Sequence, residues 1–219
     1  MDLRIPLILI NTFLAASAGL ILSSVMGIYV MKKPEPMFMI TGPIAGLVSI
    51  TASCAYVDPT EAIIIGAIGG IVSGSGILLL EKIKVDDVVS AVPVHLFAGT
   101  WATIAVAIFG DFEAMGIERP MIDQLYIQLI GIVSVGAFCF ISAFTIFFMI
   151  NLLFRLRVNK IEEDMGLNIS EHNASTATHD LLKVLNKQQE TDDFSLRAPQ
   201  DPFTEAGVVA SQYLSLIHI

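Results

Sequence analysis

The stretch VDDVVSAVPVHLFAGTWATIAVAIFG, residues 85–110, decides how the rest of the chain is interpreted. Its apolar run from Val88 to Phe109 contains a single ionisable side chain, His95. A membrane-spanning helix needs about 20 residues at a rise of about 1.5 Å each, so this run is long enough to cross a bilayer. Ionisable side chains are costly inside a membrane and usually face a cavity or a partner. The stretch therefore predicts a membrane helix with a histidine on a pathway.

The residues around His95 are small or irregular. Pro93 removes a backbone donor two positions earlier and is expected to loosen the helix. Ala91 and Gly99, one turn on either side, would share the face of His95 and are small enough to line a lumen. A packing role stays open for all three, because a membrane histidine also serves as a hydrogen-bonding contact between helices. His95 is the main candidate for a pore residue, and Ala91 and Gly99 are secondary ones.

The composition indicates a membrane protein with a polar tail. Hydrophobic residues make up 54% of the chain and charged residues 15%, against about 25% charged in soluble domains. The net charge of −9 is concentrated in residues 161–219, where ten acidic and three basic side chains leave −7. Two domains are therefore predicted, a membrane part over 1–160 and an acidic tail over 161–219. Cys54 and Cys139 lie in apolar segments and are interpreted as small buried residues.

Apolar segments predict five membrane spans, at residues 5–31, 37–57, 62–80, 88–109 and 122–154. Thr60 is a candidate N-cap for the third span. The third span also carries Gly66, Gly70 and Gly74 at intervals of four residues. This spacing places three glycines on one helix face and favours close approach of a neighbouring helix.

The basic residues predict the orientation of these spans. Alternate loops hold seven of them, and the opposite side has only Arg4 and Arg119; the seven are Lys32, Lys33, Lys82, Lys84, Arg155, Arg157 and Lys160. Basic loops usually stay in the cytoplasm, so the amino end is predicted outside and the tail inside. An outside amino end without a signal peptide favours further spans before residue 1.

Five pieces of the sequence share one order with a known family. They are NTFLAASAG (11–19), GPIAGLVSITASCAYV (42–57), IIIGAIGGIVSG (63–74), VDDVVSAVPVH (85–95) and LRVNKIEEDMGLNISEH (156–172). Together they resemble the C-terminal half of the Amt/MEP/Rh ammonium transporter family. The resemblance implies an all-α membrane protein with five transmembrane helices. These would be the second inverted repeat without its first helix, followed by the long final helix.

The same resemblance implies a site and an assembly. The family forms homotrimers in the cytoplasmic membrane, with a narrow hydrophobic pore in each subunit. His95 falls on the second of the family's two pore histidines. Leu96 and Ala102 stand where the family usually or often has glycine, and these larger side chains bear on the pore width. The implied function is transport of ammonium or ammonia. The alternative is an ammonium sensor coupled to a missing signalling domain.

The tail carries two further signals. Residues 162–172 resemble the family's cytoplasmic segment, which contacts neighbouring subunits and can meet a PII-type signal protein. Leucines at helical spacing predict a helix over 178–190 with Thr178 as a candidate N-cap, and residues 192–207 are interpreted as a linker. Whether this extension is a fused signalling module or a disordered acidic tail stays open. No cofactor, metal, enzymatic activity or nucleic-acid partner is expected.

Overall fold

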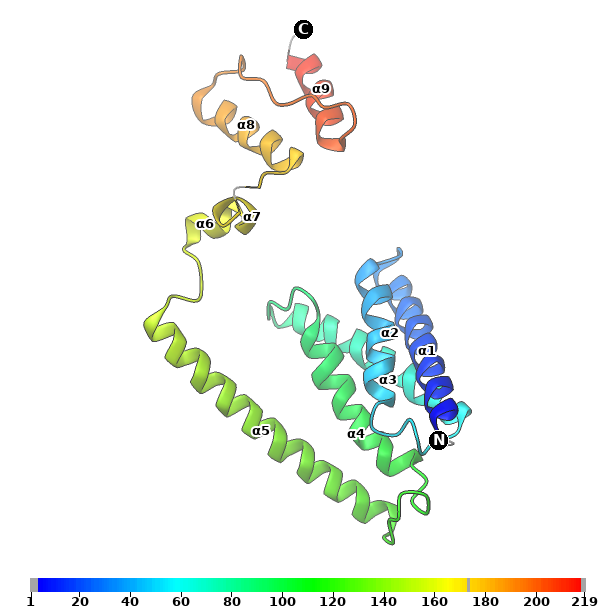
Figure 1. The fold of residues 1–219 in the computed structure, drawn as a ribbon. Helices are drawn as coiled ribbons and strands as arrows, with labels where there is room; N and C mark the ends of the chain where they lie inside the picture. Colours follow the sequence, from blue (N-terminus) through cyan, green and yellow to red (C-terminus); the bar gives the residue numbers. More distant parts are fainter. Residues whose placement is uncertain (1–3, 173, 218–219) are drawn as a thin grey trace. The chain divides into compact units, whose positions relative to one another are not determined.

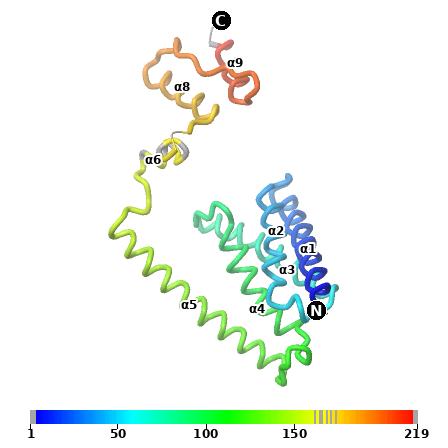
Figure 2. The backbone as a smooth tube through the Cα atoms, in the orientation of Figure 1, coloured from blue at the N-terminus to red at the C-terminus, as the bar shows by residue number. Residues whose placement is uncertain are grey.

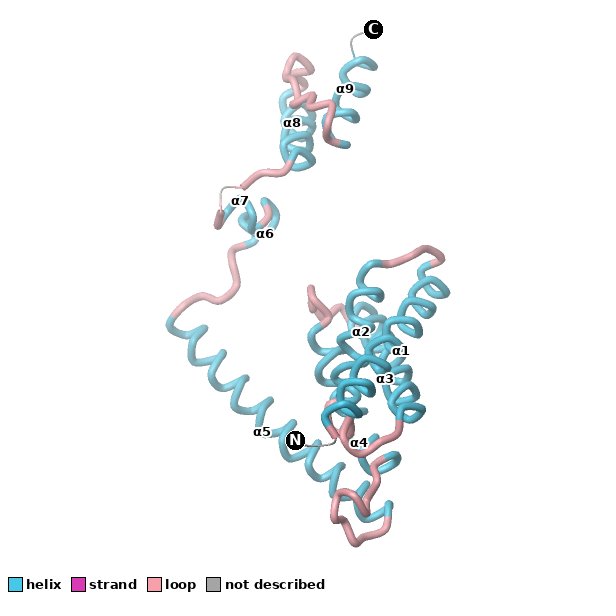
Figure 3. Tube along the Cα trace, turned by 45° about the vertical axis from the view of Figure 1, so that its right-hand side comes forward, coloured by secondary structure: helices cyan, strands magenta, loops and turns pink. Residues whose placement is uncertain are grey.

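The computed structural model describes residues 4–172 and 174–217, and this part of the chain is built of helices and loops (Figures 1 and 3). The side chains of residues 161, 164, 165, 168 and 170 lie outside the description. The all-α fold class predicted from the sequence is confirmed. The chain divides into two compact units, Met1–Phe144 and Thr145–Ile219.

Three closely packed helices form the body of the first unit: α1 (Ile5–Met31), α2 (Pro36–Ile50) and α3 (Pro59–Lys82) (Figures 1 and 2). The contact between α1 and α3 depends on residues without side chains. A Cβ atom added to Gly66 would lie 2.5 Å from the Cα atom of Ala15, and one added to Gly70 would lie 2.5 Å from the carbonyl oxygen of Gly19. The predicted glycine face is therefore confirmed as a helix contact.

The second predicted span is helical over a shorter stretch than expected. The expectation ran to residue 57, but α2 ends at Ile50 and turns follow. The side chain of Asn11, which is fully buried, donates from Nδ2 to the carbonyl oxygens of Cys54 (2.9 Å) and Val57 (2.8 Å). This amide satisfies carbonyl groups that a continued helix would otherwise have paired, and so stabilises the turn.

The sequence suggested Thr60 as the N-cap of α3, but Asp58 caps this helix instead. One oxygen of Asp58 accepts from the backbone of Thr60 (2.7 Å) and Glu61 (2.9 Å), and the Glu61 carboxylate accepts from the backbone of Asp58 (2.9 Å). Pro59 follows Asp58 and has no N–H to satisfy, so it fits the first helical position. The residue before the proline therefore takes the capping position, and Thr60 lies inside the first turn.

The histidine span begins with a π-helix. The segment η1 (Val92–Phe97) leads directly into α4 (Ala98–Phe109), and α5 (Met121–Leu153) follows after a loop. Residues 88 and 89 lie in a turn, so this span starts later than the predicted residue 88. Among the described residues, four helical stretches are long and apolar enough to cross a membrane, α1, α3, Val92–Phe109 and α5, and α2 is a shorter apolar helix.

The second unit holds the tail helices, α6 (Lys160–Met165), α7 (Leu167–Ser170), α8 (Ala177–Thr191) and α9 (Glu205–Ile217). The N-cap of α8 is Thr176, whose hydroxyl accepts from the backbone of His179 (3.2 Å), so the assignment to Thr178 is wrong. The predicted linker over 192–207 ends earlier than expected, because α9 already begins at Glu205.

The helices α8 and α9 form a hairpin with a small core of its own, made by Leu181, Ala198, Ala206 and Ala210. A buried glutamine connects the two helices and the loop between them. Gln188 donates from Nε2 to the carbonyl oxygen of Leu196 (2.8 Å) and accepts at Oε1 from the hydroxyl of Tyr213 (3.0 Å). This part of the acidic tail is thus folded over residues 177–217.

Candidate functional site

The helix that carries His95 is irregular at that residue. The backbone N–H of Ala98 points to the carbonyl oxygens of both Pro93 and His95, and the intervening segment has π-helical pairing. Pro93 has no N–H to give to the preceding turn, which favours such a break. The loosening that the sequence predicted around Pro93 is confirmed. Widened turns of this kind often occur at functional sites.

Two hollows on the first unit meet at His95. One has a volume of about 450 Å³ and lies between α4 and α5; we call it the α5-side hollow. Its lining residues are His95, Leu96, Gly99, Thr100, Thr103, Gly131, Ile132, Val135, Gly136 and Cys139. The α2-side hollow has a volume of about 430 Å³, and its lining residues are Met37, Ile40, Thr41, Ile44, Val88, Val89, Ala91, Val94 and His95. His95 borders both hollows.

Of the three residues singled out from the sequence, His95 borders both hollows and each of the other two lines only one of them. Gly99 lines the α5-side hollow, and Ala91 lines the α2-side hollow. The side chain of His95 is exposed in this chain. It is exposed because α2 and α5 stand back from it and leave the two hollows open.

The two departures from the family pattern have different surroundings. Leu96 is 55% exposed and lines the α5-side hollow next to His95. Ala102 is 4% exposed and lies within the packed helices. The methyl group of Ala102 thus affects helix packing, whereas the side chain of Leu96 takes up space beside the histidine.

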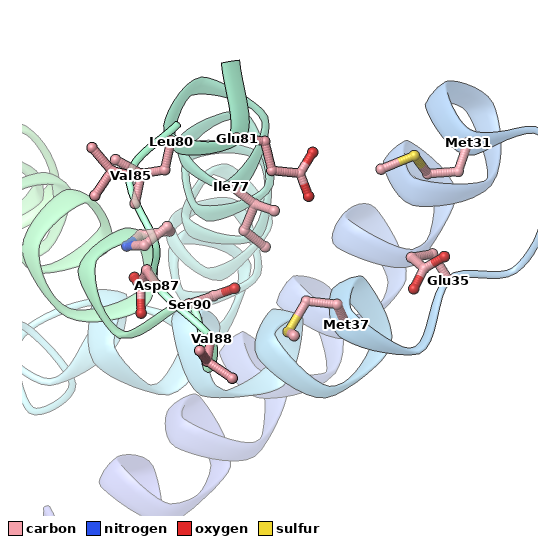
Figure 4. A pocket seen from close by; sticks show the side chains of 11 residues that line it. Met31, Glu35, Met37, Ile77, Leu80, Glu81, Val85, Asp87, Val88 and Ser90 are labelled. Carbon is pink, nitrogen blue, oxygen red and sulfur yellow. The ribbon is translucent and has the colours of Figure 1, made fainter. Parts of the chain in front are cut away.

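A third hollow of about 370 Å³ lies near one end of the helices (Figure 4). Its lining residues are Met31, Glu35, Met37, Ile77, Leu80, Glu81, Val85, Asp87, Val88, Ser90 and Pro93. It shares Met37 and Val88 with the α2-side hollow, so the two hollows adjoin. This hollow could not be predicted from the sequence, because its walls come from three separate segments that no local pattern connects.

The described residues show no group of three or more histidine, cysteine or acidic side chains placed to hold a metal ion. Cys54 is half-buried and Cys139 is exposed, and both are free thiols. The hollows at His95 are lined by apolar residues together with the hydroxyl groups of Thr41, Thr100 and Thr103. Within these largely apolar walls the site offers one imidazole and a few hydroxyls.

Comparison with known proteins identifies the family of this chain. The model of the Ammonium Transporter Family matches residues 2–177. A putative ammonium transporter of Synechocystis, sll0537, is 37% identical and is matched over 96% of this chain and 39% of its own length. Ammonium transporter Amt2 of Archaeoglobus fulgidus is 38% identical over 79% of this chain and 39% of its length. The chain thus spans about two fifths of the length of these curated relatives.

Solved structures share the fold. A sensor Amt protein superposes with a TM-score of 0.72 and 33% identity, over 78% of this chain and 43% of that protein. Mep2 of Candida albicans superposes with a TM-score of 0.66 and 23% identity, over 89% of this chain and 43% of Mep2. From the family match, the spanning helices and these structural relatives, the chain is a multi-pass membrane protein that belongs to the ammonium transporter family.

Proposed function

We propose that this chain forms part of a pathway that carries ammonium or ammonia across the cytoplasmic membrane, with His95 on the pathway. The observation that carries the proposal is the place of His95 at the junction of two apolar hollows. Membership of the ammonium transporter family supports the choice of substrate. Family relatives named as transporters also favour transport over enzymatic catalysis.

The chemistry of the site suits this substrate. A charged ammonium ion loses much hydration energy on entering an apolar passage, whereas neutral ammonia loses little. A hydrocarbon-lined pathway therefore rejects Na⁺ and K⁺, which have no proton to give up. A neutral imidazole has one donor and one acceptor nitrogen, so His95 would hydrogen-bond ammonia or accept a proton from ammonium. Ala91 and Gly99 would leave room for the substrate on the two sides of the ring.

We further propose that the exposed side of His95 faces the rest of the family fold in a longer protein. The chain covers about two fifths of its curated relatives, and the remaining length would supply the opposite wall of the pathway. The long helix α5 has no buried residue in its most apolar 18-residue window, which leaves much of the surface of that window for lipid or for other subunits. A homotrimer would use part of that surface.

The decisive experiment replaces His95 in a full-length protein that contains this chain. His95→Ala should abolish ammonium uptake into sealed vesicles and weaken the exclusion of K⁺, because the donor and acceptor are lost and the passage widens. His179→Ala, on the tail helix α8, is the matched control and should transport normally. A folded His95→Ala protein with normal ammonium flux and normal K⁺ exclusion would refute the pathway role of His95.

The proposed orientation places the amino end of α1 outside and the tail in the cytoplasm, with residues 1–160 as the membrane domain. The seven-to-two distribution of basic residues supports it. A reporter that works only in the cytoplasm should be active after Lys160 or within 82–86 and inactive within 111–120. The opposite pattern would overturn the orientation, and with it the proposed access of PII-type signal proteins to residues 162–172.

A second function, ammonium sensing, is favoured by one structural relative and by the tail. The sensor Amt protein superposes on most of the chain, and the folded hairpin α8–α9 extends beyond residue 177, where the family match ends. In a sensor, binding at the membrane part would change a signalling output while net flux stays low. Ammonium-dependent output together with background-level methylammonium uptake would favour the sensor over the transporter.

A further inference from the structure

The π-helix η1 has an anchor that the family comparison does not assign. We infer that Asp87 is a positioning residue, which holds the amino end of η1 and thereby sets where the imidazole of His95 stands between the two hollows. The consequence for transport rests on the proposed function. The hydrogen bonds between Asp87 and the start of η1 do not depend on that function.

Where η1 begins, Asp87 accepts hydrogen bonds from nearly all the backbone N–H groups that have no partner within the helix. Its Oδ1 accepts from the N–H of Ala91 (2.9 Å) and its Oδ2 from the N–H of Val92 (2.8 Å). Its backbone carbonyl accepts from the N–H of Ser90 (3.1 Å). Helix amino ends leave such donors without intrahelical partners, and an unpaired donor is costly. One aspartate therefore receives three consecutive N–H groups.

The next two positions complete the pairing. Pro93 has no N–H, and the N–H of Val94 reaches the carbonyl oxygen of Ser90 (3.2 Å). This arrangement requires Ser90 to turn back with a φ angle of 56°, a left-handed conformation that ordinary side chains rarely adopt. The Asp87 contacts hold the chain in that conformation. Two bonds from one charged carboxylate are also stronger than neutral ones, and the charge favours the positive end of the helix.

The side of η1 is held as firmly as its end. A Cβ atom added to Gly76 of α3 would lie 2.8 Å from Cε2 of Phe97 and 3.1 Å from Cβ of Pro93. Two residues of η1 thus pack directly against the backbone of α3. The hydrogen bonds of Asp87 at its end and the close packing against Gly76 at its side together restrain the position of η1. A shift of η1 would move His95, which lies between Pro93 and Phe97 in the chain.

The neighbouring residue supplies a matched control. Asp86 has the same charge, is exposed, and makes no side-chain hydrogen bond within the described part of the chain. Asp87 is half-buried and makes two. Asp87→Asn keeps one acceptor oxygen and places an amide donor where the second N–H needs an acceptor. Asp86→Asn removes the same charge and leaves the helix end unchanged.

The test uses the full-length protein in vesicles, with two measurements on each variant. Hydrogen exchange of the amides at residues 91–97 reports the anchor, and ammonium uptake with K⁺ exclusion reports the position of His95. In Asp87→Asn, exchange at residues 91 and 92 should rise about fivefold and uptake should fall about fivefold, the size of a lost helix cap. Asp86→Asn should match the parent protein in both measurements.

Two results would overturn the inference: unchanged exchange at residues 91 and 92 in Asp87→Asn, or faster exchange with normal uptake and normal K⁺ exclusion. If Asp87→Asn does not accumulate, Asp87→Ser replaces it, because a serine still caps with one oxygen. A parent protein that takes up no ammonium would refute the proposed function. The exchange data would then still decide whether Asp87 anchors the helix.

Discussion

The most apolar 18-residue windows of the helices α3 and α5 have equal mean hydropathy, but the two helices pack very differently. Half of the most apolar 18-residue window of α3 is buried, and none of the corresponding window of α5 is. Both helices contain glycines. Those of α3 meet neighbouring helices closely, and Gly66 and Gly70 meet α1, whereas the space around Gly131 and Gly136 of α5 is open to 4 Å. Hydropathy thus identifies a membrane helix, but small residues opposite small residues identify a contact.

The physical reason lies in the solvent. Lipid is as apolar as a leucine side chain, so large apolar residues gain little by leaving it for another helix. Close approach of backbones gains dispersion contacts, and only small residues permit that approach. Ala15 is fully buried between Gly46 and Gly66, whereas Phe138 on α5 is 73% exposed. The surface of α5 suits lipid or a partner helix.

The largest expected effect separates the glycines of the two helices. Gly66→Ala places a methyl group 2.5 Å from the Cα atom of Ala15, so the backbones of α1 and α3 must move apart. We expect a loss of about 3 kcal/mol in the free energy of unfolding, measured by denaturing-detergent titration. Gly131→Ala is the matched control, because its methyl group meets open space. Equal losses for both variants would break the comparison.

A smaller effect is expected from the buried amide of α1. Asn11→Ala leaves the carbonyl groups of Cys54 and Val57 without their side-chain donor. The expected loss is about 1–2 kcal/mol in the same titration, the range for polar contacts between membrane helices. Thr12→Ala is the control, since the Thr12 hydroxyl donates only to Ile8 of its own helix. An Asn11→Ala protein as stable as the control would show that the turn after α2 is stable without the hydrogen bonds of Asn11.

The smallest effect concerns the two thiols and requires no change in stability. Cys139 on α5 is exposed, whereas Cys54 in the turn after α2 is half-buried. The Sγ atom of Cys54 lies 3.8 Å from the carbonyl oxygen of Thr51. A lipid-soluble maleimide should therefore label Cys139 before Cys54 in this chain, with Cys139→Ser identifying the fast site. Slower labelling of Cys139 in a longer protein would locate the surface that covers α5. Faster labelling of Cys54 in this chain would contradict the packing described for the turn.

Local patterns predicted the elements whose causes are local. The bounds of α1 agree with the predicted residues 5–31, and α5 differs from its prediction by one residue at each end. The early end of α2 escaped prediction because Asn11, which contacts the turn that follows, has its partners 43 and 46 residues away. The first three residues of α9 fall within the predicted linker, because this end of the helix is a mixture of polar and small residues that pack only once α8 is present.

Local patterns also predicted only part of the candidate site. His95, Ala91 and Gly99 were chosen from their types and spacing, and all three line the hollows. Their part in transport remains a proposal. The place of Asp87 could not be predicted, because it depends on the left-handed turn at Ser90 that returns the helix end to the carboxylate. The sequence of two adjacent aspartates in a loop does not show which of them accepts hydrogen bonds from the backbone at the helix end.

The amide of Asn11 also sets an order of events during synthesis. When α1 leaves the ribosome, the carbonyl groups that Asn11 will serve have not yet been made, since they lie at residues 54 and 57. A lone amide in hydrocarbon is costly, so α1 should not settle in lipid by itself. It should wait beside the insertion machinery until the next turn arrives, and the two should then enter the bilayer as one cooperative insertion step.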